Sequence, residues 1–136
     1  RLETVRLWRG VSFVNDSKAT NVDSTRVALQ SFSGNLHVIM GGEDKGSPYG
    51  PLAPLLKAKA LRILLIGAAA KKIKKELGDI VPVVLCGSLE RAVEAAAQGA
   101  RPGDVVLLSP ACASFDQFDN FEHRGQVFKK LVYELS

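Results

Sequence analysis

The stretch VVLLSPACASFDQFDNF, residues 105–121, carries the most information about the fold. Its first four residues form an apolar run that is typical of a strand buried on both faces of a sheet. The hydroxyl-rich turn after this run leads to Asn120, which can cap a final amphipathic helix. Because the first amides of such a helix point outward and attract anions, the stretch predicts an α/β domain with a carboxylate or phosphate site after this strand.

Apolar runs and amphipathic segments alternate along the rest of the chain. We expect strands at residues 36–40, 61–66, 81–85 and 105–108, and helices at residues 51–59, 69–77, 88–98 and 120–135. Two β-rich runs, residues 2–8 and 11–15, flank Arg9-Gly10 and predict an antiparallel hairpin, after which Asn21 caps a further helix. The pattern predicts a three-layer αβα, Rossmann-like domain with a mainly parallel sheet of about six strands and an N-terminal antiparallel hairpin.

Three polar segments begin close to the ends of predicted strands. We call them loop A (NDSKATN, residues 15–21), loop B (GGEDKG, residues 41–46) and loop C (SPACASFDQFDNF, residues 109–121). Ligands of parallel sheets bind outside the carboxyl ends of the strands, so we expect the three loops to meet at one edge. The chain has neither a Gly-x-x-x-x-Gly-Lys-Ser/Thr phosphate loop nor a Gly-x-Gly-x-x-Gly fingerprint, so any ATP chemistry needs a phosphate loop from elsewhere.

Length and composition restrict the class of protein. The 136 residues fit one domain, and 46% hydrophobic with 24% charged residues is ordinary for a soluble globular chain. No apolar run approaches the roughly 20 residues that span a bilayer. The sequence also shows no secretion leader, so we expect a cytoplasmic protein without a membrane partner.

The net charge of +4 does not by itself indicate a nucleic-acid partner. The only cluster of cations flanks Ile73 on a predicted helix and consists of Lys71, Lys72, Lys74 and Lys75. We interpret this cluster as a solvated helix face, because no aromatic residues interleave with the lysines to stack on bases. We therefore expect no nucleic-acid partner.

Neither the cysteines nor the histidines form a metal motif. Cys86 and Cys112 lack the paired spacing of zinc or thioredoxin-like sites, which predicts two reduced, semi-buried thiols. His37 and His123 have no second ligand at metal spacing. We therefore predict no metal site in this chain.

Loops A, B and C, in this order and spacing, resemble the Mur ligases of peptidoglycan synthesis, in particular the members that add D-glutamate. The resemblance covers residues 1–136 and corresponds to the C-terminal, amino-acid-binding domain, so the N-terminal UDP-binding domain and the central ATPase domain are absent from this chain. It implies an ATP-dependent ligase that forms an acyl phosphate on UDP-N-acetylmuramoyl-L-alanine, which the amine of D-glutamate then attacks. ATP and Mg²⁺ are implied to be held mainly by the absent central domain.

The resemblance also implies roles for individual residues. The α-carboxylate of glutamate is expected to contact Thr20 and Lys45, and its side-chain carboxylate the Ser114 hydroxyl and the Phe121 backbone amide. Arg1 and Asp16 are the implied nucleotide contacts. No catalytic residue is implied within this chain, and Lys18 has no assigned role.

Loop C also contains the aromatic residues Phe115 and Phe121. The Phe121 side chain is expected to lie in the core, on a helix face shared with Phe128 and Val132. Phe115 departs from the family pattern, in which many members carry a smaller aliphatic residue, and this changes the expected pocket wall.

Two other classes of protein remain as alternatives. One is a different ligase domain of the superfamily, such as a folylpolyglutamate synthase or the diaminopimelate-adding Mur ligase, although the Asp-Asn-Pro motif of the latter does not occur here. The other is a non-catalytic module with a nucleotide-binding-like fold, since a fold does not determine a function. In the preferred interpretation, the isolated domain is an inactive monomer that reaches the UDP-sugar substrate only through the absent domains.

Overall fold

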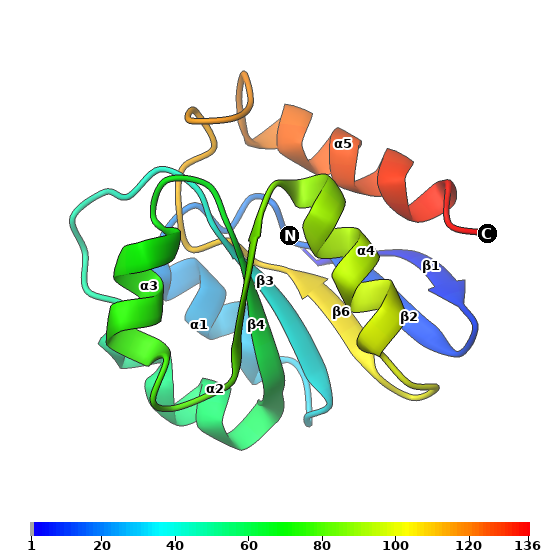
Figure 1. Ribbon diagram of the computed structural model, residues 1–136, viewed down its shortest axis with the longest axis horizontal. Helices are drawn as coiled ribbons and strands as arrows, with labels where there is room; N and C mark the ends of the chain where they lie inside the picture. Colours follow the sequence, from blue (N-terminus) through cyan, green and yellow to red (C-terminus); the bar gives the residue numbers. More distant parts are fainter. Residues whose placement is uncertain (1) are drawn as a thin grey trace.

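A six-stranded sheet forms the centre of the protein, in the order β1-β2-β6-β3-β4-β5 (Figure 1). The computed structural model describes residues 2–136. The strands are β1 (Glu3–Trp8), β2 (Val11–Asn15), β3 (Leu36–Gly41), β4 (Ala60–Ile66), β5 (Val83–Gly87) and β6 (Val105–Leu108). The helices are α1 (Val22–Gln30), the 3₁₀ turn η1 (Gly50–Leu52), α2 (Ala53–Lys59), α3 (Ala70–Leu77), α4 (Leu89–Gly99) and α5 (Phe121–Tyr133).

The sheet is parallel except for its first pair of strands. β1 pairs with β2 in antiparallel orientation, and their turn has positive φ angles at Arg9 (50°) and Gly10 (80°), as a tight hairpin turn requires. β6 lies between β2 and β3 and is parallel to both. The predicted hairpin and the mainly parallel sheet are therefore confirmed.

β5 begins two residues later than predicted, at Val83 instead of Val81. Pro82 has no amide proton to donate to a neighbouring strand, although its carbonyl oxygen accepts from the amide of Ile63 at 2.9 Å. Val81 is buried at the end of the α3 turn. In this apolar run, Val81 therefore packs in the core, and the strand begins only at Val83.

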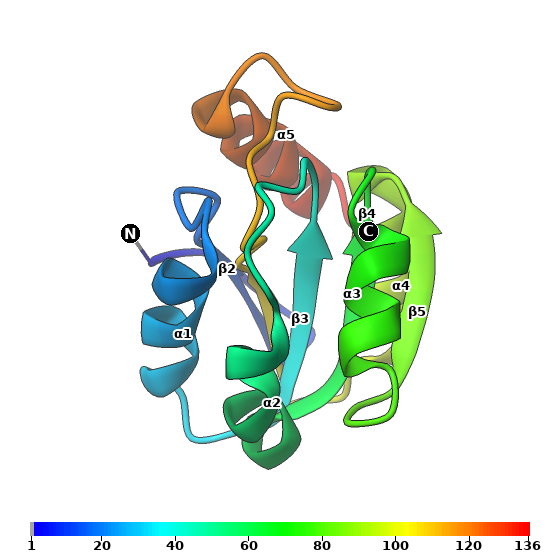
Figure 2. The same ribbon diagram turned by 90° about the vertical axis from the view of Figure 1, so that its left-hand side faces the viewer.

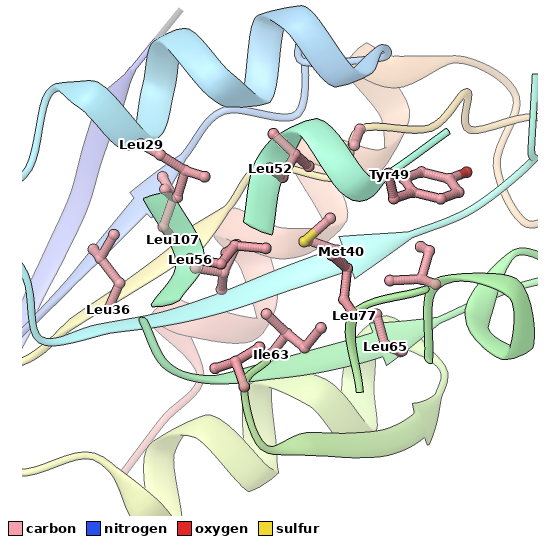
Figure 3. Packing of buried hydrophobic residues seen from close by; sticks show 14 of the residues in the cluster. Leu29, Leu36, Met40, Tyr49, Leu52, Leu56, Ile63, Leu65, Leu77 and Leu107 are labelled. Atoms are coloured by element: carbon pink, nitrogen blue, oxygen red, sulfur yellow. The ribbon is translucent and has the colours of Figure 1, made fainter. Parts of the chain in front are cut away.

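Helices cover both faces of the sheet (Figure 2). On one face, α1, α2 and α3 pack over an apolar cluster that includes Leu29, Met40 and Leu56, and Figure 3 shows these side chains between the helices and the strands. On the other face, α4 and α5 pack over a second cluster that includes Val93 and Phe128. The predicted three-layer arrangement is therefore confirmed.

The C-terminal end of α5 is held by β1. Arg6 Nη1 donates to the carbonyl oxygens of Val132 (2.9 Å) and Leu135 (3.0 Å). Carbonyl groups at the end of a helix have no intrahelical partners and carry partial negative charge, so the guanidinium satisfies them. This contact fixes the orientation of α5, whose first turn follows loop C.

A polar triad of one buried and two half-buried residues lies at the opposite end of the sheet from the loops. Arg62 Nε donates to His37 Nδ1 at 2.9 Å, and His37 Nε2 lies 2.8 Å from Asp104 Oδ2. Because arginine can only donate, the His37 proton is on Nε2 and is donated to the carboxylate. Burial raises the pKa of Asp104, but the hydrogen bonds from His37 and from the Arg101 amide outweigh burial and lower this pKa below its ordinary value of 3.8.

Because folding lowers the pKa of Asp104, the free energy of unfolding depends on pH in the acidic range. Its contribution is fully present above pH 3.8, the ordinary value, and is lost as the pH falls through the lower folded-state pKa. We expect Asp104→Asn to cost about 1 to 2 kcal/mol at pH 7 and to flatten the decline in unfolding free energy below about pH 4. Urea unfolding measured from pH 7 to pH 2 tests this, with Asp79→Asn at an exposed position as control. An unchanged acid slope in Asp104→Asn would contradict the assignment.

Candidate functional site

Loops A, B and C meet at the carboxyl edge of the sheet. They follow β2, β3 and β6, which are neighbours in the sheet. Backbone hydrogen bonds join the loops and strand ends: Asp16 N to Leu108 O (2.8 Å), Gly41 N to Pro110 O (3.0 Å), Ala111 N to Ala19 O (2.9 Å) and Glu43 N to Ala113 O (2.9 Å). The predicted convergence of the three loops is therefore confirmed.

Loop A places Asp16 and Thr20 on one pocket. Asp16 is buried and accepts a hydrogen bond from Ser109 Oγ at 2.9 Å, which links loop A to the start of loop C. Thr20 is half-buried, and Asn21 caps α1 by accepting from the amide of Ser24 at 2.8 Å. Asp16 and Thr20 both line a pocket of about 630 Å³ beside α1. Asp16 and Thr20 therefore line the same cavity.

Loop B places Lys45 on an adjoining pocket. Lys45 is exposed and lines a cavity of about 160 Å³ together with Asn21 and Tyr49. Asn21 also lines the larger pocket that contains Thr20. Thr20 and Lys45 therefore face neighbouring parts of the same edge.

The chain around Lys45 is fixed by a buried tyrosine. The Tyr49 hydroxyl donates to Asp44 Oδ1 at 2.7 Å, and Lys72 Nζ donates to both Asp44 carboxylate oxygens at 3.1 Å and to the Ser47 carbonyl oxygen at 3.2 Å. The hydrogen bonds from Tyr49 and Lys72 lower the pKa of Asp44. Lys72 is therefore not part of a purely solvated helix face, and that interpretation is wrong for this residue because α3 packs beside loop B.

Loop C buries Ser114 and begins α5. Ser114 is 2% exposed, and its carbonyl oxygen accepts from the Phe118 amide at 2.9 Å, which closes a turn. Asn120 caps α5 as predicted, since its Oδ1 accepts from the His123 amide at 2.7 Å. The Phe121 amide belongs to the first turn of this helix, where backbone amides have no intrahelical partner.

The Phe121 side chain does not lie in the core, so that expectation is wrong. It is half-buried and lines a pocket of about 280 Å³ together with Lys18 and Ser17. Phe121 is the first residue of α5, and the apolar cluster under this helix is formed by residues further along it, such as Phe128. Phe115, the residue that departs from the family pattern, is 66% exposed.

The proposed ligand residues do not share a single cavity. Thr20, Lys45 and Phe121 line three separate pockets along the carboxyl edge, and Ser114 lines none of these three. The structure thus brings the loops together but leaves Thr20, Lys45 and Phe121 on separate pockets and Ser114 buried outside them. Arg1 lies outside the described residues.

Sequence analysis missed Arg124, a fully buried arginine beneath the loops. Its guanidinium donates to the Ser17 hydroxyl and carbonyl of loop A and to the Cys112 carbonyl of loop C. One signal was available, because Arg124 lies three residues after Phe121 and four before Phe128, on the buried face of α5. An arginine on such a face needs several internal acceptors.

Both cysteines are free, as predicted, but they are buried and not semi-buried. Burial raises the pKa of each thiol. Within residues 2–136 no group of three or more His, Cys, Asp or Glu side chains is arranged to hold a metal ion. No helix in the same part of the chain is both long enough and apolar enough to cross a membrane.

The fold and the converging loops define the class of protein. A family model described as "Mur ligase, glutamate ligase domain" matches residues 1–112, and the chain belongs to this family. Among known structures, a crystal structure of a domain assigned to a UDP-N-acetylmuramate:L-alanyl-gamma-D-glutamyl-diaminopimelate ligase of Haemophilus ducreyi matches with a TM-score of 0.60 and 17% identity, over 96% of this chain and 99% of that domain. At this identity the likeness supports the fold alone.

Three relatives that are closer in sequence bear the name UDP-N-acetylmuramoylalanine–D-glutamate ligase. The protein from Koribacter versatilis is 55% identical over 100% of this chain, that from Acidobacterium capsulatum 54% over 97%, and that from Elusimicrobium minutum 52% over 99%. The chain spans about 30% of the length of these relatives.

Proposed function

We propose that this chain is the C-terminal, amino-acid-binding domain of an ATP-dependent ligase that adds D-glutamate to UDP-N-acetylmuramoyl-L-alanine in the cytoplasm. The observation that carries the proposal is the meeting of loops A, B and C at the carboxyl edge, in a chain 55% identical to a relative bearing that enzyme's name. A small amino acid with two carboxylates needs donors from more than one direction, and three loops from adjacent strands supply them.

The α-carboxylate of glutamate is assigned to Thr20 and Lys45. Lys45 is exposed on a loop that Tyr49 and Lys72 hold in place, so a mobile ammonium group extends from a fixed base. Lysine presents three donors as a compact point charge, which suits a carboxylate that arrives from solvent. The hydroxyl of Thr20 adds a directional hydrogen bond from the neighbouring pocket.

The side-chain carboxylate of glutamate is assigned to Ser114 and the Phe121 amide. The amide lies in the first turn of the 13-residue helix α5, where unpaired N–H groups and the helix dipole favour an anion. Ser114 precedes this turn in the same loop and is 2% exposed, so loop C must move for its hydroxyl to reach a carboxylate held by the Phe121 amide.

Nucleotide contacts are assigned to Asp16 and Arg1, at the pocket of about 630 Å³ for Asp16. The described residues do not fit a Mg²⁺ site, since they offer no three-ligand group of acidic side chains. We therefore assign Mg²⁺ and the phosphate loop to the part of the enzyme outside this chain. The role of this domain is to carry the amine of D-glutamate to an acyl phosphate formed elsewhere, which is a matter of positioning. The isolated chain is then expected to bind without turnover.

Titration of the ¹⁵N-labelled chain with D-glutamate tests the proposal. We expect weak, saturable shifts of the Lys45, Ser114 and Phe121 amides, because the rest of the closed site is missing. Lys45→Ala removes a charge-assisted hydrogen bond of about 1.5 to 3 kcal/mol, so the affinity is expected to fall roughly tenfold to a hundredfold.

The matched control for this titration is Lys74→Ala, which removes an exposed lysine of α3 away from the site. L-glutamate, titrated in parallel, tests the choice of stereoisomer. The absence of shifts at the three amides, or equal affinities for the Lys45→Ala and Lys74→Ala variants, would exclude the proposed glutamate site.

A further inference from the structure

Arg124 joins loops A and C and lies beside loop B at the carboxyl edge. Its Nε and Nη2 donate to the hydroxyl (2.8 Å) and carbonyl (2.7 Å) oxygens of Ser17 in loop A, and its Nη1 donates to the Cys112 carbonyl oxygen (3.1 Å) in loop C. Loop B passes close to the guanidinium, since a Cβ added at Gly42 would lie 3.4 Å from Arg124 Nη1. One buried side chain therefore sets the relative positions of segments far apart in the sequence.

Ser17 extends this network to the start of α5. The Ser17 hydroxyl, which accepts from Arg124, donates to the Phe121 carbonyl oxygen at 2.8 Å. Arg124 itself lies one turn further along the same helix. The first turn of α5, including the Phe121 amide, is thereby fixed against loop A.

The charge of Arg124 is not neutralised by its hydrogen-bond partners. All three acceptors, two carbonyl groups and one hydroxyl, are uncharged. Burial lowers the pKa of Arg124 to about 10, so the guanidinium remains protonated at neutral pH. Asp116 of loop C interacts with this charge through space and offsets part of it. A positive charge held in a low-dielectric interior acts over a longer distance than one in water, so the guanidinium still contributes positive potential to the edge above it.

We propose that Arg124 is a positioning residue that fixes loops A, B and C relative to one another. Its charge makes their shared edge favour a dicarboxylic amino acid over the corresponding amide, whose side chain is uncharged. This role rests on the proposed function, since it concerns the same glutamate site. Lysine in its place would keep the charge but lose the planar fork that reaches Ser17 and Cys112 together. Methionine would remove both the charge and the fork while filling a similar apolar volume.

The test compares the affinities of D-glutamate and D-glutamine for the 136-residue chain and its variants. Binding is measured from the NMR shifts of the backbone amides. For Arg124→Met we expect at least a tenfold loss of D-glutamate affinity and a severalfold smaller preference for D-glutamate over D-glutamine. For Arg124→Lys we expect weaker binding of both ligands with the preference retained. A purely structural role would weaken both ligands equally in both variants.

Ser17→Ala provides a second, milder variant in case the arginine substitutions prevent folding. It removes the hydroxyl that joins Arg124 to Phe121 but leaves the charge, so we expect severalfold weaker D-glutamate binding, an altered Phe121 amide shift and an unchanged preference over D-glutamine. If the unmodified chain shows no shifts with D-glutamate, the proposed function fails. If it binds and the variants keep both its affinity and its preference, the role of Arg124 is overturned.

Discussion

Gly41→Ala is expected to reduce the free energy of unfolding by about 4 kcal/mol, the sum of backbone strain and overpacking. Gly41 ends β3 with a φ of 119°, which side-chain-bearing residues rarely adopt. A Cβ at this position would overlap the carbonyl oxygen of Ile66 in the paired strand β4 and lie 2.9 Å from the Ile66 nitrogen. Neither contact can be relieved by rotating a side chain, because both atoms belong to the backbone.

Substitutions at two other glycines distinguish the two contributions expected for Gly41→Ala, backbone strain and steric overlap. Gly46 has a φ of 89°, but no heavy atom lies within 4 Å of its added Cβ, so Gly46→Ala should cost only the strain of about 1 to 2 kcal/mol. Gly34 has open space and no such φ, so Gly34→Ala is expected to be neutral or slightly stabilising. Urea unfolding followed by far-UV circular dichroism measures all three variants. A cost for Gly41→Ala no greater than that for Gly46→Ala would refute the overlap at β4.

Phe128→Ala is the second variant with a large expected effect, a loss of about 3 to 5 kcal/mol. Phe128 is fully buried on the inner face of α5, in the cluster that includes Phe13 of β2 and Leu108 of β6. Its removal would leave a cavity between α5 and the strands that lead into loops A and C. Hydrogen exchange is therefore expected to rise along α5 more than in α2, which lies on the other face of the sheet (Figure 2).

The matched control on the same helix is Tyr133→Ala. The Tyr133 side chain is 59% exposed, and its backbone carbonyl, which accepts from Arg6, is kept in the variant. Its cost should stay within about 0.5 kcal/mol. Similar losses for Phe128→Ala and Tyr133→Ala in thermal or urea unfolding would mean that α5 is not held by its buried face.

The strands and helices were predictable because their signals are local. The apolar run of β6, the positive-φ turn at Arg9-Gly10 and the cap at Asn120 each depend on a few adjacent residues. The start of β5 was misplaced because Val81 and the strand residues after Pro82 are equally apolar. Only the packing of the turn after α3 distinguishes Val81, which lies outside the strand, from the residues of β5.

The candidate site was predictable in its loops but not in its supporting contacts. Loops A, B and C follow strands whose carboxyl ends lie at one edge, so their convergence follows from the order of the elements. The lysine-rich helix predicts a solvated Lys72, because nothing in this helix reveals the Asp44 carboxylate 28 residues away. Helix periodicity predicts a core position for the Phe121 side chain, but it does not indicate that the helix begins at this residue.

Local patterns along the chain are sufficient to predict the α/β class, the hairpin and the position of each loop after a strand, because hydrophobic period, turn residues and capping residues act over short distances. The side chains that support the site become evident only from the folded arrangement. Arg124 and Ser17 are 107 residues apart in the sequence. The guanidinium of Arg124 can be buried with its donors paired only because the fold brings the acceptors of loops A and C to it. Contacts of this kind depend on three-dimensional proximity, which cannot be read from local patterns of residues along the chain.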